Sequence, residues 1–84
     1  MAKVGADNLT HFHTRAGRAL LQWSTADLAE KAGSTAANVR KFEAGRNVSE
    51  GVRQALVDAL EDAGIELLNG KRPGARYKSA PSSE

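Results

Sequence analysis

Apolar residues recur with the period of an α-helix through most of the first 64 residues of the chain. The strongest run predicts a helix over about 50–63, with an apolar face made of Val52, Ala55, Leu56, Ala59, Leu60 and Ala63. A second run predicts a helix over about 10–22, whose inward face comprises Phe12, Ala16, Ala19, Leu20 and Trp23. Shorter runs predict helices over about 25–32, with Leu28, Ala29 and Ala32 facing inward, and over about 36–44.

Capping residues stand at the ends of these four segments. Short polar side chains that can accept a hydrogen bond from a free helical N–H precede each one: Thr10 or Asn8, then Ser24, Thr35 and Ser49. Asp27 stands three residues after Ser24, which is the spacing of a capping box. Three of the segments are followed by a glycine, the residue that most readily adopts the left-handed conformation ending a helix: Gly33, Gly45 and Gly64.

The pattern changes after Gly64. Two short strands, at about 65–68 and 75–78, flank a loop containing glycine and proline and predict a β-hairpin. The predicted fold is therefore mainly α, with four helices followed by a short hairpin. We expect a flexible N-terminus at 1–8, a helical domain at 9–64, the hairpin at 65–78 and a disordered tail at 79–84.

Composition narrows the class of protein. The chain has 84 residues and no cysteine, so it is the size of one small domain without a disulfide framework. Its start lacks the apolar run of a signal peptide, and no stretch is long and apolar enough to span a bilayer, so we expect a cytoplasmic protein with no membrane partner.

The charged residues are unevenly distributed along the chain: residues 1–46 and 71–84 each carry a net charge of +3, and residues 47–70 carry a net charge of −4. Basic segments suit a polyanionic partner, although ordinary solvated charge explains them equally well.

The third predicted helix has two chemically different sides. Val39, Phe42 and Glu43 fall on one side, and Ala37, Arg40, Lys41 and Ala44 lie roughly opposite. The outer side is basic and is narrow near the N-terminus of the helix. A helix about 10–12 Å across fits the major groove of B-form DNA, which is about 12 Å wide. A basic helix that is simply exposed to water is the alternative.

The segment from Thr25 to Gly45 resembles the helix-turn-helix of the phage repressor and Cro-like family, also called the xenobiotic-response-element family. The matching positions are Leu28, Ala29, Gly33, Val39, Phe42, Glu43 and Gly45. The wider stretch RAGRALLQWSTADLAEKAG, followed later by GIELLNGKRPGAR, resembles a common bacterial subgroup of small regulators, so the resemblance covers about residues 9–78.

This resemblance implies a repressor-like, sequence-specific DNA-binding domain in which the helix at 36–44 reads base edges in the major groove. The base-facing positions would be Thr35, Ala36, Ala37, Asn38, Arg40 and Lys41. The phosphate-contacting positions would be Thr25, Gly45, Arg46 and Asn47. The chain departs from the family at Thr25, where many members have glutamine, and at Ser34, where an apolar residue is usual. Because Ala36 and Ala37 cannot hydrogen-bond a base, specificity would depend on their polar neighbours or on DNA shape.

The resemblance also implies a structural ion pair between Arg18 and Glu43. We further expect a homodimer, because one short reading helix with two alanines makes few contacts and dimers of this motif read paired half-sites. The candidate dimer contacts are Leu67, Leu68 and Tyr77, which could equally cover the core of their own domain.

Other chemistry finds little support in the sequence. His11 and His13 point in different directions on a helix, so we expect surface histidines and no shared metal ion. No nucleophile, base and orienting group form a recognisable set, and no cofactor motif is present, so we do not expect an enzyme. The leading hypothesis is a transcriptional regulator, most readily a repressor binding a palindromic operator in double-stranded DNA. The alternatives are an antitoxin or mobile-element regulator that also binds a protein partner, and a protein-interaction module that does not use DNA.

Overall fold

A computed structural model describes residues 4–69 and 73–78. It contains the helices α1 (His11–Leu21), α2 (Thr25–Ala32), α3 (Ala36–Glu43) and α4 (Glu50–Asp62), followed by the strands β1 (Ile65–Leu68) and β2 (Gly74–Tyr77). The prediction of a mainly helical fold with a C-terminal hairpin is confirmed. The disordered tail expected at 79–84 lies outside the described residues. No helix within the described ranges has the length and apolar character needed to cross a lipid bilayer.

The helix ends form where the local sequence predicts them. The Ser24 hydroxyl accepts from the Asp27 N–H at 3.0 Å, and the Asp27 carboxylate accepts from the Ser24 N–H at 2.9 Å, which completes the capping box of α2. The Thr35 and Ser49 hydroxyls cap α3 and α4 with one bond each, accepted from the N–H groups of Asn38 and Val52. Gly33 ends α2 in the left-handed conformation at φ 67°. These caps fix both ends of the short turn between α2 and α3.

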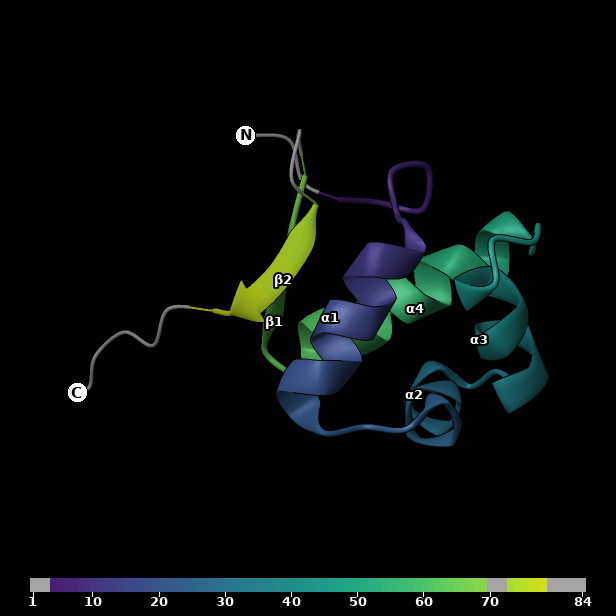
Figure 1. The fold of residues 1–84 in the computed structure, drawn as a ribbon, viewed down its shortest axis with the longest axis horizontal. Coiled ribbons are helices and arrows are strands. Elements are labelled where there is room, and N and C mark those ends of the chain that lie inside the picture. Colours follow the sequence, from purple (N-terminus) through teal and green to yellow (C-terminus); the bar gives the residue numbers. More distant parts are fainter. Residues whose placement is uncertain (1–3, 70–72, 79–84) are drawn as a thin grey trace.

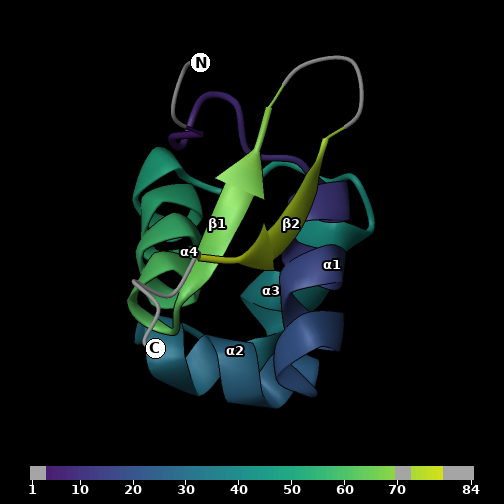
Figure 2. The same cartoon turned by 90° about the vertical axis from the view of Figure 1, so that its left-hand side faces the viewer.

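The hairpin lies on the opposite side of the helices from α3 (Figure 1). Its strands are antiparallel, with Ile65 opposite Tyr77 and Leu68 opposite Gly74. In the turned view β1 runs beside α4 and β2 beside α1, so the hairpin covers both helices (Figure 2). Ile65 is completely buried and Leu67 is 6% exposed. Leu67 is therefore part of the core of its own chain, which is the alternative that the sequence left open for the predicted dimer contacts.

The buried side of α1 differs from the predicted one. Phe12 is 55% exposed and Ala19 is exposed, whereas His13, Thr14 and Gly17 are buried. Gly17 faces Leu60 of α4, and a Cβ added at Gly17 would lie 2.8 Å from a Leu60 methyl carbon. A side chain at this point would therefore require the buried Leu60 side chain to shift. Phe12 thus faces solvent, whereas Leu20 and Trp23 of the predicted face are half-buried and pack against the core.

The expectation that both histidines lie on the surface is wrong for His13, which is fully buried. Its Nδ1 accepts from the Thr10 N–H at 2.9 Å, which leaves Nε2 as the N–H that donates to the Leu68 carbonyl at 2.7 Å. The neutral ring therefore joins the start of α1 to the end of β1. A buried polar side chain is stable here because both of its nitrogens are bonded.

The start of the chain is also packed more closely than expected. Val4 is 1% exposed and Ala6 5% exposed, so these two residues of the predicted flexible N-terminus pack against the domain, while Asp7 and Asn8 are exposed. Arg53 of α4 donates from Nε to the Ala6 carbonyl at 3.1 Å and from Nη1 to the Val48 carbonyl at 2.7 Å. One arginine thus attaches both the N-terminal segment and the loop before α4.

Candidate functional site

The outer side of α3 is exposed and basic. Ala37, Arg40, Lys41 and Ala44 are exposed, whereas Val39 is completely buried and Phe42 is 8% exposed. The helix therefore rests on an apolar inner side and presents two cations between two alanines. We call these four exposed residues the α3 outer face. Its small residues allow a partner to approach the backbone, and its cations favour a partner with negative charge.

The predicted base-facing residues divide into two groups. Thr35, Ala37, Arg40 and Lys41 are exposed, as reading positions must be. Ala36 is half-buried and packs against the core, so it is poorly placed for a base contact. Asn38 is also half-buried, and its side-chain amide donates to the Ser34 hydroxyl at 3.1 Å. In the first group, Ala37, Arg40 and Lys41 present their side chains to solvent, whereas the Thr35 hydroxyl also accepts the Asn38 N–H that caps α3.

The Ser34–Asn38 hydrogen bond was not anticipated from the sequence. The Ser34 N–H also donates to the Ala29 carbonyl at 2.9 Å, and the Gly33 N–H donates to the Glu30 carbonyl at 3.2 Å. These two backbone bonds close the end of α2, and the Ser34 hydroxyl connects that turn to the first turn of α3. A polar contact thus stands where the resembled family usually has an apolar residue. The spacing of serine and asparagine four residues apart was its signal in the sequence.

The predicted pair between Arg18 and Glu43 is present. Arg18 donates from Nη2 to one oxygen of the Glu43 carboxylate at 2.6 Å and from Nε to the other at 3.0 Å. The side chains are 20% and 6% exposed, so this two-bond contact is largely shielded from water. Arg18 also donates from Nη1 to the Trp23 carbonyl at 3.3 Å. This arginine therefore attaches α1 both to the last residue of α3 and to the segment that leads into α2.

A second arginine reaches the same glutamate. Arg15 donates from Nη2 to the backbone carbonyl of Glu43 at 3.0 Å, and its Nε lies 3.9 Å from the Glu43 carboxylate. The Arg15 side chain is 57% exposed. Sequence reasoning missed this contact, since it joins residues 28 positions apart and one end of it is a backbone atom.

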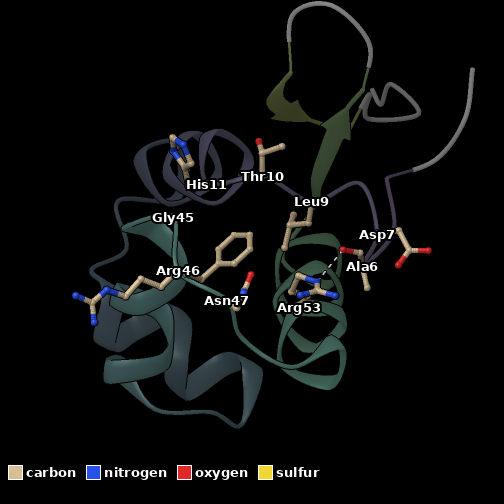
Figure 3. A pocket seen from close by; sticks show the side chains of 10 residues that line it. Ala6, Asp7, Leu9, Thr10, His11, Gly45, Arg46, Asn47 and Arg53 are labelled. Atoms are coloured by element: carbon tan, nitrogen blue, oxygen red, sulfur yellow. Dashed lines mark hydrogen bonds between the residues drawn. The ribbon is translucent and has the colours of Figure 1, made fainter.

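The loop after α3 carries most of the predicted phosphate-contacting residues. Gly45, Arg46 and Asn47 are exposed, and Thr25 at the start of α2 is half-buried. Gly45 adopts φ 84°, and the Arg46 N–H returns to the Lys41 carbonyl at 3.0 Å. Arg46 and Arg53 both line the neighbouring hollow, and Figure 3 shows the exposed Arg46 side chain pointing away from Arg53, which is directed toward Ala6. Arg46 is thus free to meet an external anion, whereas Arg53 holds the chain together.

The predicted dimer contacts differ in how they are placed. Leu67 is buried, Leu68 is half-buried, and Tyr77 is 53% exposed with its hydroxyl donating to the Leu20 carbonyl. On the other face of the hairpin, Arg76 bonds the Glu66 carboxylate at 2.9 Å. That contact holds the pKa of Glu66 below its usual value of 4.5. Leu68 and Tyr77 therefore remain the two candidate contacts that a second chain could reach.

Comparisons of the chain with protein-family models and with curated proteins found no match. The function is therefore inferred from the residues and the geometry described above.

Proposed function

We propose that this chain is a DNA-binding transcriptional regulator and that α3 is its reading helix. The observation that carries the proposal is the α3 outer face, a narrow and basic helix surface held at a fixed angle by the Arg18–Glu43 pair. A helix presented in this way has the width and charge needed to enter a major groove. The regulator would act in the cytoplasm, as a repressor that occupies its operator.

The roles of the individual residues follow from their exposure. Lys41 and Arg40 are the candidates for base edges, since both cations can donate to the acceptors of guanine. Ala37 can pack against a thymine methyl group. Arg46, with the backbone of Gly45 and Asn47, would contact phosphates and fix the orientation of the helix on the duplex. Thr25 would add a phosphate contact at the start of α2.

A homodimer would provide the affinity that one short helix lacks. Two copies related by twofold symmetry read half-sites about one helical turn of DNA apart. We infer that the contact lies at the hairpin, on the opposite side of the helices from α3 (Figure 1), with the exposed Tyr77 and the half-buried Leu68 as its candidate residues. Sedimentation of the parent protein and of a Tyr77→Lys variant tests this placement. A parent dimer that the substitution dissociates supports it, and a variant dimer of unchanged stability contradicts it.

The direct test of function is selection of DNA sequences from a random duplex pool by the purified protein at near-physiological salt. Enrichment of one palindromic sequence, with an affinity that falls steeply as salt rises, is the expected result. A protein-interaction module would retain no duplex and show no such salt dependence. An antitoxin or mobile-element regulator would bind DNA and additionally a second protein.

A further inference from the structure

Arg15 and Arg18 of α1 both reach Glu43 at the end of α3, but they differ in how many of their N–H groups form hydrogen bonds. Arg18 commits three of its N–H groups to the Glu43 carboxylate and the Trp23 carbonyl. Arg15 commits one, to the Glu43 backbone carbonyl, and no other hydrogen bond of its guanidinium is present within residues 4–69 and 73–78. An arginine has five N–H donors, so most of those on Arg15 stay available to a ligand.

The charge at this point is also unbalanced. The Glu43 carboxylate is bonded at both oxygens by Arg18, at 2.6 and 3.0 Å, whereas the Arg15 Nε lies 3.9 Å away. Two guanidinium groups therefore share one carboxylate, which leaves an excess positive charge. Because the Arg15 side chain is 57% exposed, this charge faces solvent.

The contact of Arg15 with Glu43 places this excess positive charge beside the end of α3. Its Nη2 donates to the carbonyl of Glu43, the last residue of α3, and the exposed residues Gly45, Arg46 and Asn47 follow one residue later in the chain. The bond to the Glu43 carbonyl limits the freedom of a long side chain before any ligand arrives. A guanidinium held in this way loses less conformational entropy on binding an anion.

We propose that Arg15 is a phosphate-contacting residue, held by the Glu43 carbonyl so that its free N–H groups meet the DNA backbone beside the end of α3. The inference rests on the proposed function, which it extends to a residue outside the α2–α3 unit. Arg15 would carry no sequence information, because a phosphate contact is the same for every base pair. The alternative is that Arg15 only stabilises the negative end of α3.

The test is the salt dependence of binding to a short random-sequence duplex, measured by fluorescence anisotropy. For Arg15→Gln, the slope of log affinity against log salt concentration should fall by about one for each protomer bound. Arg15→Lys keeps the charge and should retain most of the slope. Melting temperatures are recorded in parallel, so that binding is compared only between folded proteins.

Lys78→Gln is the matched control. The Lys78 ammonium also bonds a backbone carbonyl near a helix end, that of Glu61 at 2.9 Å, but it lies at the hairpin and away from α3. Its loss removes the same charge and should leave the slope unchanged. An Arg15→Gln slope equal to that of the parent overturns the Arg15 inference and leaves the proposed function standing. A parent protein without salt-dependent DNA binding overturns the proposed function itself.

Discussion

Two regions of this molecule are attached to α1 by different chemistry. The end of α3 is held by charge, through Arg18 and Arg15 on Glu43. The hairpin is held by apolar packing of Ile65 and Leu67 and by the neutral hydrogen bonds of His13. A charged attachment fixes direction, because a two-bond arginine–carboxylate contact tolerates little rotation. An apolar attachment stabilises without fixing an angle so closely, which suits a region whose task is to cover the core.

The largest expected effect comes from breaking the charged attachment. Glu43→Ala leaves the Arg18 guanidinium largely buried without its carboxylate, and removing one partner of a buried pair costs about 3–5 kcal/mol. We expect a loss of this size in the free energy of unfolding, measured by urea titration. Glu30→Ala, which removes an exposed glutamate from α2, should stay within about 0.5 kcal/mol of the parent. Equal stability of the two variants would show that Glu43 is not held as described.

A double variant sharpens this result. Arg18→Met combined with Glu43→Leu removes both charges and replaces them with apolar side chains. Since the cost of the single change comes mainly from an unpaired buried charge, the double variant should recover much of the lost stability. The same variant should bind DNA less well than the parent, because the angle of α3 is no longer fixed by the pair. A double variant as unstable as Glu43→Ala would argue against the unpaired charge as the cause.

A smaller effect is expected at the hairpin attachment. His13→Leu leaves the Thr10 N–H and the Leu68 carbonyl without the ring that bonds them, and a buried polar group without a partner costs about 1–3 kcal/mol. His11→Leu is the control, because the buried Nδ1 of His11 has no hydrogen-bond partner within the described residues. Urea titration should give a clearly larger loss for His13→Leu. Equal losses would mean that the His13 hydrogen bonds contribute nothing beyond the volume of the ring.

The smallest effect belongs to the exposed Glu66–Arg76 pair. Arg76 lowers the pKa of Glu66 below 4.5, so the stability from this pair is present at pH values above 4.5 and is lost as pH falls through the lowered pKa. Arg76→Gln should therefore lower the melting temperature slightly at neutral pH, and the difference from the parent should vanish at low pH. A difference that grows on acidification would have the wrong sign for this pair.

The same two regions differ in how far the sequence predicts them. The ends of α2 and α3 depend on four residues that bond to neighbours three or four positions away: Ser24, Asp27, Gly33 and Thr35. The sequence therefore predicts these helix ends. The buried face of α1 depends on Gly17 meeting Leu60 and on His13 meeting Leu68, contacts between distant segments. Hydrophobic periodicity places Leu20 and Trp23 correctly but misses His13 and Thr14, because it scores both as polar without regard to the partners that satisfy them.

The candidate site shows the same division. The exposed side of α3 follows from its own periodicity, and the Arg18–Glu43 pair follows from the resemblance to a known family. The contact of Arg15 with a backbone carbonyl and the half-buried position of Ala36 depend on how α3 rests on its neighbours. Neither has a signature in the sequence.

The central claim is that the α3 outer face reads DNA, and the affinity of Lys41→Ala for a selected operator tests it most directly. Lys41 is exposed, so the substitution should leave the melting temperature nearly unchanged. The account predicts a loss of about 1–3 kcal/mol in operator binding, with relaxed discrimination at the base pair that Lys41 contacts. Equal affinity of the variant and the parent for that operator would contradict the claim.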